Sequence, residues 1–191
     1  MSSSHVKHSI ISKKMAASDF GWEDRGWKFY PEELAKSPSL KTMSRHDEKT
    51  LKRNVHTFLF ECGKRLKMKT LVMAASATIC QRYYAQRSFK DIPRYHVGSA
   101  ALLLASKAEE FPASMEDILM VAYDVWNNTD RYPEKRKKYF KSQMFEENAT
   151  KLALAERALM CSINFDFNIE HAYPYVYEVV ETCGKNGKIV R

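Results

Sequence analysis

Residues 96–112 read HVGSAALLLASKAEEFP, and this stretch decides the fold of the chain. Between Val97 and Ala105 the residues are almost all small or aliphatic, and alanine and leucine favour a helix over a strand. A helix that is apolar on every face has to be surrounded by others, so we predict a central buried helix over about 94–110. Its end nevertheless carries Lys107 and two adjacent carboxylates. Because carboxylates oppose the partial negative charge at a helix C-terminus, this charged tip requires an explanation.

Apolar residues recur at intervals of three and four in four further segments, which predicts two helices on each side of the central one. Either Ser44 or Asp47 is suited to cap the first of them, and Ser114 begins a capping-box pattern at the fourth helix of the chain. Asn164 tolerates the left-handed conformation that ends the fifth. No segment alternates convincingly between apolar and polar residues. The predicted fold class is therefore all-α, with five helices. The four segments are residues 44–66, 70–86, 114–126 and 141–163.

The segments on either side of this helical domain differ from it in composition. Residues 1–20 are serine-rich and basic, which predicts a disordered tail. Residues 21–43 carry two tryptophans, a phenylalanine and a tyrosine, and these large apolar surfaces predict an arm that docks onto the domain. We expect the helical domain itself over 44–168, followed by 169–191 as a linker and a partial sixth helix.

Charge and cysteine usage restrict the class of protein. The formal net charge is +8, and much of it lies in the N-terminal tail and in the stretch 131–141, which we interpret as a solvated basic loop. The four cysteines form no Cys-x-x-Cys pair, which argues against zinc ribbons and suits a reducing intracellular compartment. Cys80 and Cys161 lie among apolar residues of predicted helices, so we expect both in the core. The longest apolar run is too short to span a bilayer.

The sequence holds no recognisable catalytic constellation. Its six glycines form no phosphate-binding loop, and it has neither a Gly-x-Ser-x-Gly elbow nor a His-Glu-x-x-His motif. Adjacent carboxylates occur at 109–110 and 146–147, but neighbouring residues on a helix point about 100° apart and do not converge on one substrate atom. The chain is therefore predicted to be a binding module, without a cofactor or a metal.

Four separated motifs resemble one family in order and spacing. Residues 102–110, LLLASKAEE, resemble the third-helix motif of the cyclin box, a fold whose five-helix order has an apolar third helix. Residues 27–39 are similar to the N-terminal arm of the transcriptional cyclins of the T and K types, and residues 81–95 to their loop between helices two and three. Residues 165–171 resemble the exit from their first box. The resemblance covers about residues 27–183.

The resemblance implies a regulatory subunit, not an enzyme. Such cyclins bind and activate a cyclin-dependent kinase that phosphorylates the repeated tail of RNA polymerase II during transcription elongation, in the nucleus. In this family the lysine of a Lys-x-Glu-Glu motif and a glutamate of the fifth helix bond to the kinase around its mobile helix. These residues are Lys107 and Glu156 here. Glu110 is expected to add a contact or steer docking, and Phe165 to supply apolar contact area. The resemblance implies no membrane contact and no metal.

Other interpretations remain open. Lys107 and Glu156 could simply pair on the surface, an interaction worth ~0–1 kcal/mol. The basic charge would also suit a cyclin-fold DNA-binding transcription factor, although a solvated tail and loop argue against direct nucleic-acid binding. Cyclins of this type carry two five-helix repeats, and we expect this chain to contain only the first, with the second repeat missing and its start truncated. Such a chain could bind the kinase without activating it. Its uncovered apolar surface would lie around Phe167, Tyr173, Tyr175 and Tyr177.

Overall fold

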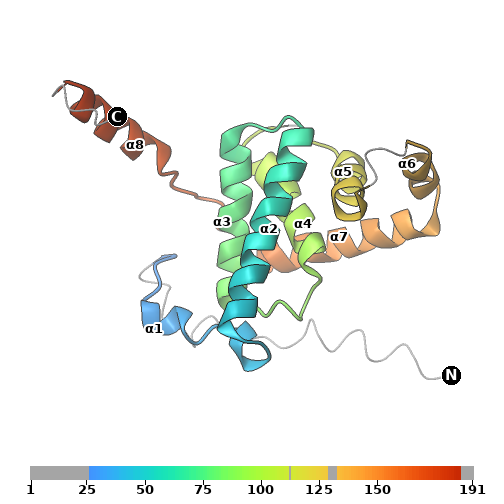
Figure 1. Ribbon diagram of the computed structural model, residues 1–191, viewed down its shortest axis with the longest axis horizontal. Coiled ribbons are helices and arrows are strands. Elements are labelled where there is room, and N and C mark those ends of the chain that lie inside the picture. Colours follow the sequence, from blue (N-terminus) through green and yellow to red (C-terminus); the bar gives the residue numbers. More distant parts are fainter. Residues whose placement is uncertain (1–25, 112, 129–132, 186–191) are drawn as a thin grey trace. The chain divides into compact units, whose positions relative to one another are not determined.

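The computed structural model describes residues 26–111, 113–128 and 133–185 (Figure 1). The chain divides into two compact units, one that ends at Lys36 and one that begins at Ser37. In the first unit the described residues form one short helix, α1 (Pro31–Leu34), whose start is stabilised by a 2.7 Å hydrogen bond from the Tyr30 amide to the Glu33 carboxylate. The predicted disordered tail over residues 1–20 and the first tryptophan of the predicted arm lie outside the described residues.

The described residues of the second unit form a bundle of five helices and three further helical segments (Figure 1). The part of the chain that the structure describes contains no strand, so the all-α prediction is confirmed. The five long helices match the five predicted from periodicity. They are α2 (Arg45–Arg65), α3 (Thr70–Gln86), α4 (Arg94–Ala108), α5 (Met115–Asn127) and α7 (Gln143–Ser162). The three further segments are η2 (Pro38–Lys41), α6 (Pro133–Phe140) and α8 (Tyr173–Lys185).

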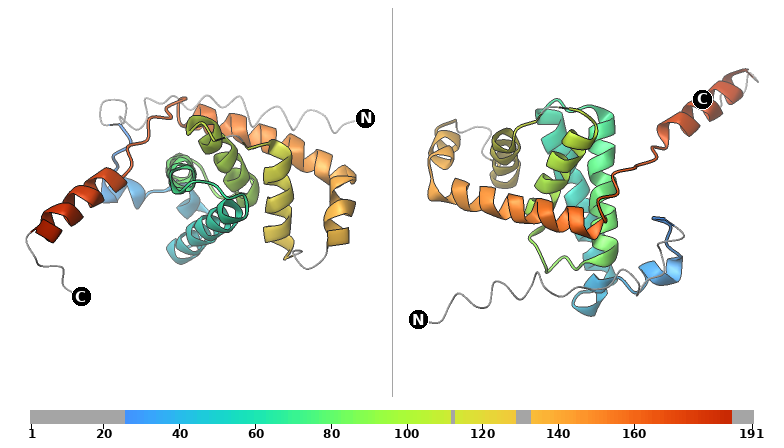
Figure 2. Two further views of the ribbon diagram at one scale, coloured as in Figure 1. Left: turned by 90° about the horizontal axis from the view of Figure 1, so that it is seen from above. Right: turned by 180° about the vertical axis from the view of Figure 1, so that it is seen from behind.

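The apolar helix α4 is the centre of the bundle, as its composition predicts. It packs against α2, α3, α5 and α7 (Figure 2), and every side chain from His96 to Ser106 is buried. Its small residues have a packing role: a Cβ atom at Gly98 would lie 2.9 Å from the Phe58 ring of α2. The missing side chain therefore lets that ring approach the axis of the central helix.

Local signals set the helix boundaries. The Ser44 hydroxyl accepts a hydrogen bond from the Asp47 amide at 3.1 Å, so Ser44 and not Asp47 caps α2. Ser114 accepts a hydrogen bond from the Asp117 amide at 3.0 Å, which confirms the predicted cap of α5. Asn164 has a φ of 51° beyond the end of α7, which confirms the predicted left-handed cap. In the same motif at α4 the left-handed residue is Glu110, with a φ of 51°.

The end of α4 therefore differs from the prediction. The helix stops at Ala108, and the Phe111 amide bonds back to the Ser106 carbonyl at 2.8 Å. This bond and that of the Glu110 amide to the Lys107 carbonyl form a Schellman motif. The two carboxylates thus follow the helix and are not part of its last turn.

Two further sequence interpretations were wrong. The basic stretch 131–141 is not simply a loop, because Pro133–Phe140 form α6. Cys80 is buried, as expected, but Cys161 is exposed. The buried face of α7 runs through residues such as Ala155 and Leu159, and a residue two positions after Leu159 points about 200° away from it.

Residues 37–39 belong to the second unit. The Ser37 hydroxyl donates a hydrogen bond of 2.6 Å to the buried Glu48 carboxylate, and the Phe89 amide donates one of 3.1 Å to the Ser39 hydroxyl. These contacts tie the entry of the bundle to α2 and to the loop after α3. At the other end, every described side chain of α8, residues 173–183, is exposed. None of the described helices is both long enough and apolar enough to cross a membrane.

Candidate partner-binding site

The structure brings Lys107 and Glu156 into direct contact. Lys107 lies in the last turn of α4, where the helix dipole favours a cation, and its Nζ is 2.6 Å from Glu156 Oε1 on α7. Glu156 follows the fully buried Ala155, so it stands at the edge of the face that packs against the bundle. The side chains are 60% and 14% exposed, respectively. The ammonium group therefore faces solvent, while the carboxylate is held at the seam between the two helices.

Glu110 and Phe165 lie at the ends of these same two helices. Phe165 follows the left-handed Asn164, has a φ of 57° itself and is 63% exposed. A bulky residue with a positive φ is rare, and an exposed phenyl ring has no burial to compensate for it. Within the described residues, the side chains of Glu110 and Phe165 form no hydrogen bond or ion pair with the side chains of Lys107 and Glu156. The four predicted residues thus comprise one ion pair and two separate exposed groups at helix ends.

Arg82 holds the segment that follows Phe165, and the sequence interpretation missed it. Its guanidinium donates hydrogen bonds to the backbone carbonyls of Asp166 at 2.9 Å and Asn168 at 3.1 Å. It also lies 3.8 Å from the Asp166 carboxylate. Burial lowers the pKa of Arg82, and the Asp166 carboxylate opposes that shift. The available signal was an arginine directly before two aromatic residues, Tyr83 and Tyr84, in the predicted helix at 70–86.

A second contact involves the charged tip of α4. The Glu109 carboxylate is 3.2 Å from Nε2 of His171, in the segment that leads to α8. The sequence interpretation treated Glu109 only as a charge that opposes the helix dipole. In the structure it is a partly buried partner of an imidazole, so Glu110 is the more exposed of the two carboxylates.

The described residues at the ends of α4 and α7 form an exposed surface with charged and aromatic groups. Burial raises the pKa of the Cys62 thiol to about 12, so that buried cysteine is not a nucleophile at neutral pH. Within the described ranges, no three His, Cys, Asp or Glu side chains gather in a group that could hold a metal ion. What remains is an ammonium, a carboxylate and an aromatic ring, which suit contact with a protein surface.

Comparison with known proteins gives a family match over most of the chain. Residues 26–168 match the family described as "Cyclin, N-terminal domain". The chain is 28% identical over 167 residues to Cyclin-T1-2 of Oryza sativa subsp. japonica, covering 86% of this chain and 26% of the relative. It is 29% identical over 165 residues to Cyclin-K of Homo sapiens, covering 85% and 27%. For Cyclin-T of Drosophila melanogaster the identity is 30% over 162 residues, covering 84% and 14%. The chain therefore spans about a quarter or less of the length of these three relatives.

Proposed function

The chain belongs to the cyclin family, with T- and K-type cyclins among its relatives, and on this premise we propose that it is a regulatory subunit of a cyclin-dependent kinase. We further propose that the kinase is of the transcriptional class, acts on the tail of RNA polymerase II during elongation, and meets this chain in the nucleus. The observation that carries the proposal is the Lys107–Glu156 pair at the seam between α4 and α7.

The pair is suited to be exchanged for a partner's groups. The Lys107 ammonium is 60% exposed, so water can replace its contact with Glu156 when the two side chains separate, whereas the Glu156 carboxylate, 14% exposed, then requires donors from the partner. Before binding, the contact holds both long side chains in one place, which reduces the entropy that docking would otherwise remove. The ammonium can then bond to carbonyl groups of the kinase, and the carboxylate to its amides. Phe165, held at the end of α7, offers apolar area beside them.

The chain would act on the kinase by shifting a conformational equilibrium. A kinase is active when a helix that carries a glutamate lies inward, where this glutamate pairs with the lysine that contacts the phosphates of ATP. A subunit that binds the inward arrangement more tightly raises its population by the difference in binding free energy. No group of the cyclin takes part in the phosphoryl transfer itself.

A charge exchange between the two residues provides the test. The tagged chain would be purified from cells as wild type, as Lys107→Ala/Glu156→Ala, and as the exchange variant Lys107→Glu/Glu156→Lys. The exchange keeps an ion pair between positions 107 and 156 but reverses the charge that a partner contacts at each position. We expect both variants to lose the kinase. The control variant Glu61→Ala/Lys64→Ala removes another surface ion pair and should retain the kinase.

Two readouts separate binding from activation. Kinase capture is measured by immunoblot, and activity in the eluate by phosphorylation of a polymerase-tail peptide. If the exchange variant captures as much kinase as wild type, Lys107 and Glu156 form only a surface pair and the proposal fails. Captured but inactive kinase would instead identify a chain that occupies the kinase without activating it.

A further inference from the structure

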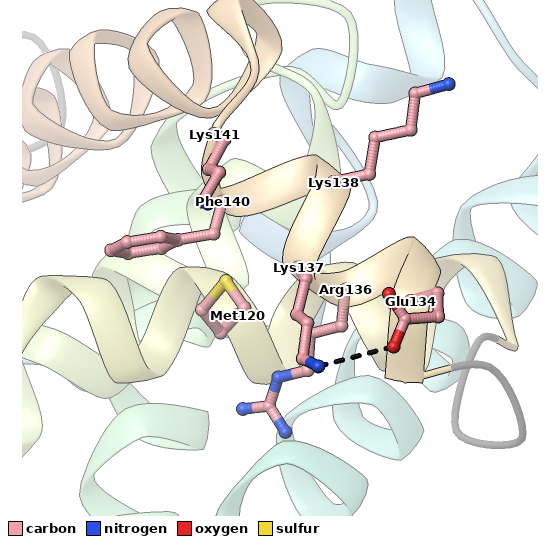
Figure 3. A pocket seen from close by; sticks show the side chains of 7 residues that line it. All are labelled: Met120, Glu134, Arg136, Lys137, Lys138, Phe140 and Lys141. Carbon is pink, nitrogen blue, oxygen red and sulfur yellow. Dashed lines mark hydrogen bonds and ion pairs between the residues drawn. The ribbon is translucent and has the colours of Figure 1, made fainter.

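A groove of about 530 Å³ lies beside α6, away from the ion pair of α4 and α7 (Figure 3). Helix α6 directly precedes the start of α7, whereas Glu156 lies in the second half of α7 and Phe165 follows its end. The groove lining combines α6, the residue after it and one residue of α5. These residues are Met120, Glu134, Arg136, Lys137, Lys138, Phe140 and Lys141. We call this site the α5–α6 groove.

The wall of the groove is packed against the bundle. Tyr139 is 4% exposed and stacks on Tyr123 of α5, with ring centroids 3.8 Å apart and planes at 6°. The Asn148 amide donates a hydrogen bond of 3.1 Å to the Tyr139 hydroxyl, and the Phe140 and Phe145 rings lie 5.0 Å apart. Helix α6 is thereby attached to both α5 and α7, so its basic side chains project from a fixed base.

The cations of the groove are not all compensated. Arg136 pairs with the buried carboxylate of Asp124 at 3.4 Å. Lys137 pairs with Glu134 at 3.3 Å (Figure 3). Lys138 and Lys141 form no ion pair within the part of the chain that the structure describes. Two lysines beside one groove therefore remain available to an anionic ligand.

The groove also contains exposed apolar surface. Phe140 is 49% exposed and lines the groove together with Met120 (Figure 3). A basic helix that served only solubility would account for the lysines, but it would not need an exposed aromatic ring and a methionine in the same groove. Methionine adapts its shape to different apolar partners, which suits a binding groove.

We propose that the α5–α6 groove binds an acidic peptide segment of a partner protein. An apolar side chain of the segment lies between Met120 and Phe140, and flanking carboxylates pair with Lys138 and Lys141. Charge complementarity selects an acidic ligand, and the apolar lining selects a peptide over a nucleic acid. A nucleic acid would need cations spread along several phosphates, whereas these belong to one short helix. The groove is thus a second docking site, separate from the one proposed for the kinase.

The test uses the full chain and a defined probe. The probe is a short fluorescein-labelled peptide with a central phenylalanine flanked by aspartates and glutamates, and binding is followed by fluorescence anisotropy. We expect Lys138→Glu/Lys141→Glu to weaken binding at least about tenfold, because two attractive contacts become repulsive. The control is Lys49→Glu/Arg53→Glu, which makes the same change of charge on exposed residues of α2 and should bind the probe as wild type does.

A second comparison tests the apolar part of the groove. Phe140→Ala should weaken binding of the phenylalanine peptide and leave unchanged the binding of a charge-matched peptide with a central glycine. Circular dichroism verifies that the variant is folded. Three results would overturn the proposal: no binding of the probe by wild type, equal loss in both charge-reversal variants, or tighter and strongly salt-dependent binding of a single-stranded oligonucleotide. The last would make the groove a nucleic-acid site. None of these readouts involves the kinase, so this inference and the proposed function can fail independently.

Discussion

Lys107, Glu109 and Glu110 are near neighbours in the chain, yet each reaches a different environment. Lys107 lies in the last turn of α4 and pairs with α7, while Glu109 follows the helix and contacts His171. Glu110 adopts a left-handed conformation and remains exposed. The unfavourable contact between carboxylates and the helix dipole is reduced because both lie beyond the last helical residue and one of them has an imidazole partner. Glu109 and Glu110 are adjacent in the chain, but only the Glu110 carboxylate is exposed enough for a partner to reach it.

A buried histidine predicts how stability depends on pH. Burial lowers the pKa of His96 below its ordinary value of 6.5, the hydrogen bond to Asn148 opposes this, and Lys151 adds to it. Its Nε2 faces the Asn148 carbonyl oxygen at 3.1 Å, and its buried Nδ1 has no hydrogen bond among the described residues. Protonation would therefore place an unpaired N–H in the core.

Because the native state binds fewer protons than the unfolded state at this site, His96 makes the protein less stable as the pH falls below 6.5. We expect the Tm of wild type to fall between about pH 7.5 and about pH 5.5, and to fall less in His96→Gln. Differential scanning fluorimetry measures both. The exposed His46→Gln is the control and should behave as wild type. His56, whose pKa is also lowered by burial and by Lys52, should keep part of the slope in the His96 variant.

At the scale of the element, the sequence of α4 predicts where the helix packs, whereas the sequence of α6 does not. The apolar run of α4 predicts a helix and its central position together, since such a helix has no solvated face. In α6 only Tyr139 is buried among the side chains that the structure describes, and the rest is mostly charged. No local amphipathic pattern marks such a segment as packed. Its position depends on the stacking of Tyr139 on α5 and the pairing of Arg136 with Asp124.

Two glycines in the bundle give a matched test of close packing. A Cβ atom at Gly98 of α4 would lie 2.9 Å from the buried Phe58 ring, which also contacts Tyr95 edge-on. A Cβ atom at Gly63 of α2 would lie 2.6 Å from the side chain of Met73, which is flexible. We expect Gly98→Ala to lower the free energy of unfolding by about 1–3 kcal/mol, since an aromatic ring in the core cannot easily move.

Gly63→Ala should cost less, because Met73 can change rotamer and alanine improves helix propensity by up to about 1 kcal/mol. Urea unfolding followed by circular dichroism measures both variants. A Gly98→Ala protein as stable as wild type would show that α2 and α4 can separate without loss of packing, contrary to the central role given to α4.

At the scale of the whole molecule, the bundle and the segment after it contribute differently to stability. Ile169 packs against the core and His171 contacts Glu109, so the chain up to about residue 171 is part of the bundle. Beyond it, α8 exposes apolar residues such as Tyr177, which is 75% exposed, and Val179, which is 61% exposed. Apolar side chains that are exposed in the folded state contribute little to the free energy of folding.

Two deletions test this division. Removal of residues 173–191 should leave the Tm within about 2 °C of wild type and reduce self-association, because it removes exposed apolar surface. Removal of residues 169–191 also takes away Ile169 and His171 and should lower the Tm clearly. Scanning calorimetry and light scattering provide the measurements. A large loss of Tm in the shorter deletion would mean that α8 stabilises the bundle.

The sequence by itself determined the five long helices, the cap at Ser114 and the central place of α4, and it limited the first cap to Ser44 or Asp47. These features follow from periodicity, propensity and hydrogen bonds between residues a few positions apart, all of which are local. The family resemblance selected Lys107 and Glu156 in advance, but their contact joins residues 49 apart in the chain.

Only the tertiary structure decided that Lys107 and Glu156 meet, that Arg82 holds the segment after Phe165, and that α6 forms a groove with α5. Each of these contacts joins residues from different elements, and its geometry depends on how the helices cross. No pattern within one segment contains that information. The local sequence pattern therefore determines which face of each helix is apolar and can pack. How the helices pack around α4 then decides which side chains come into contact.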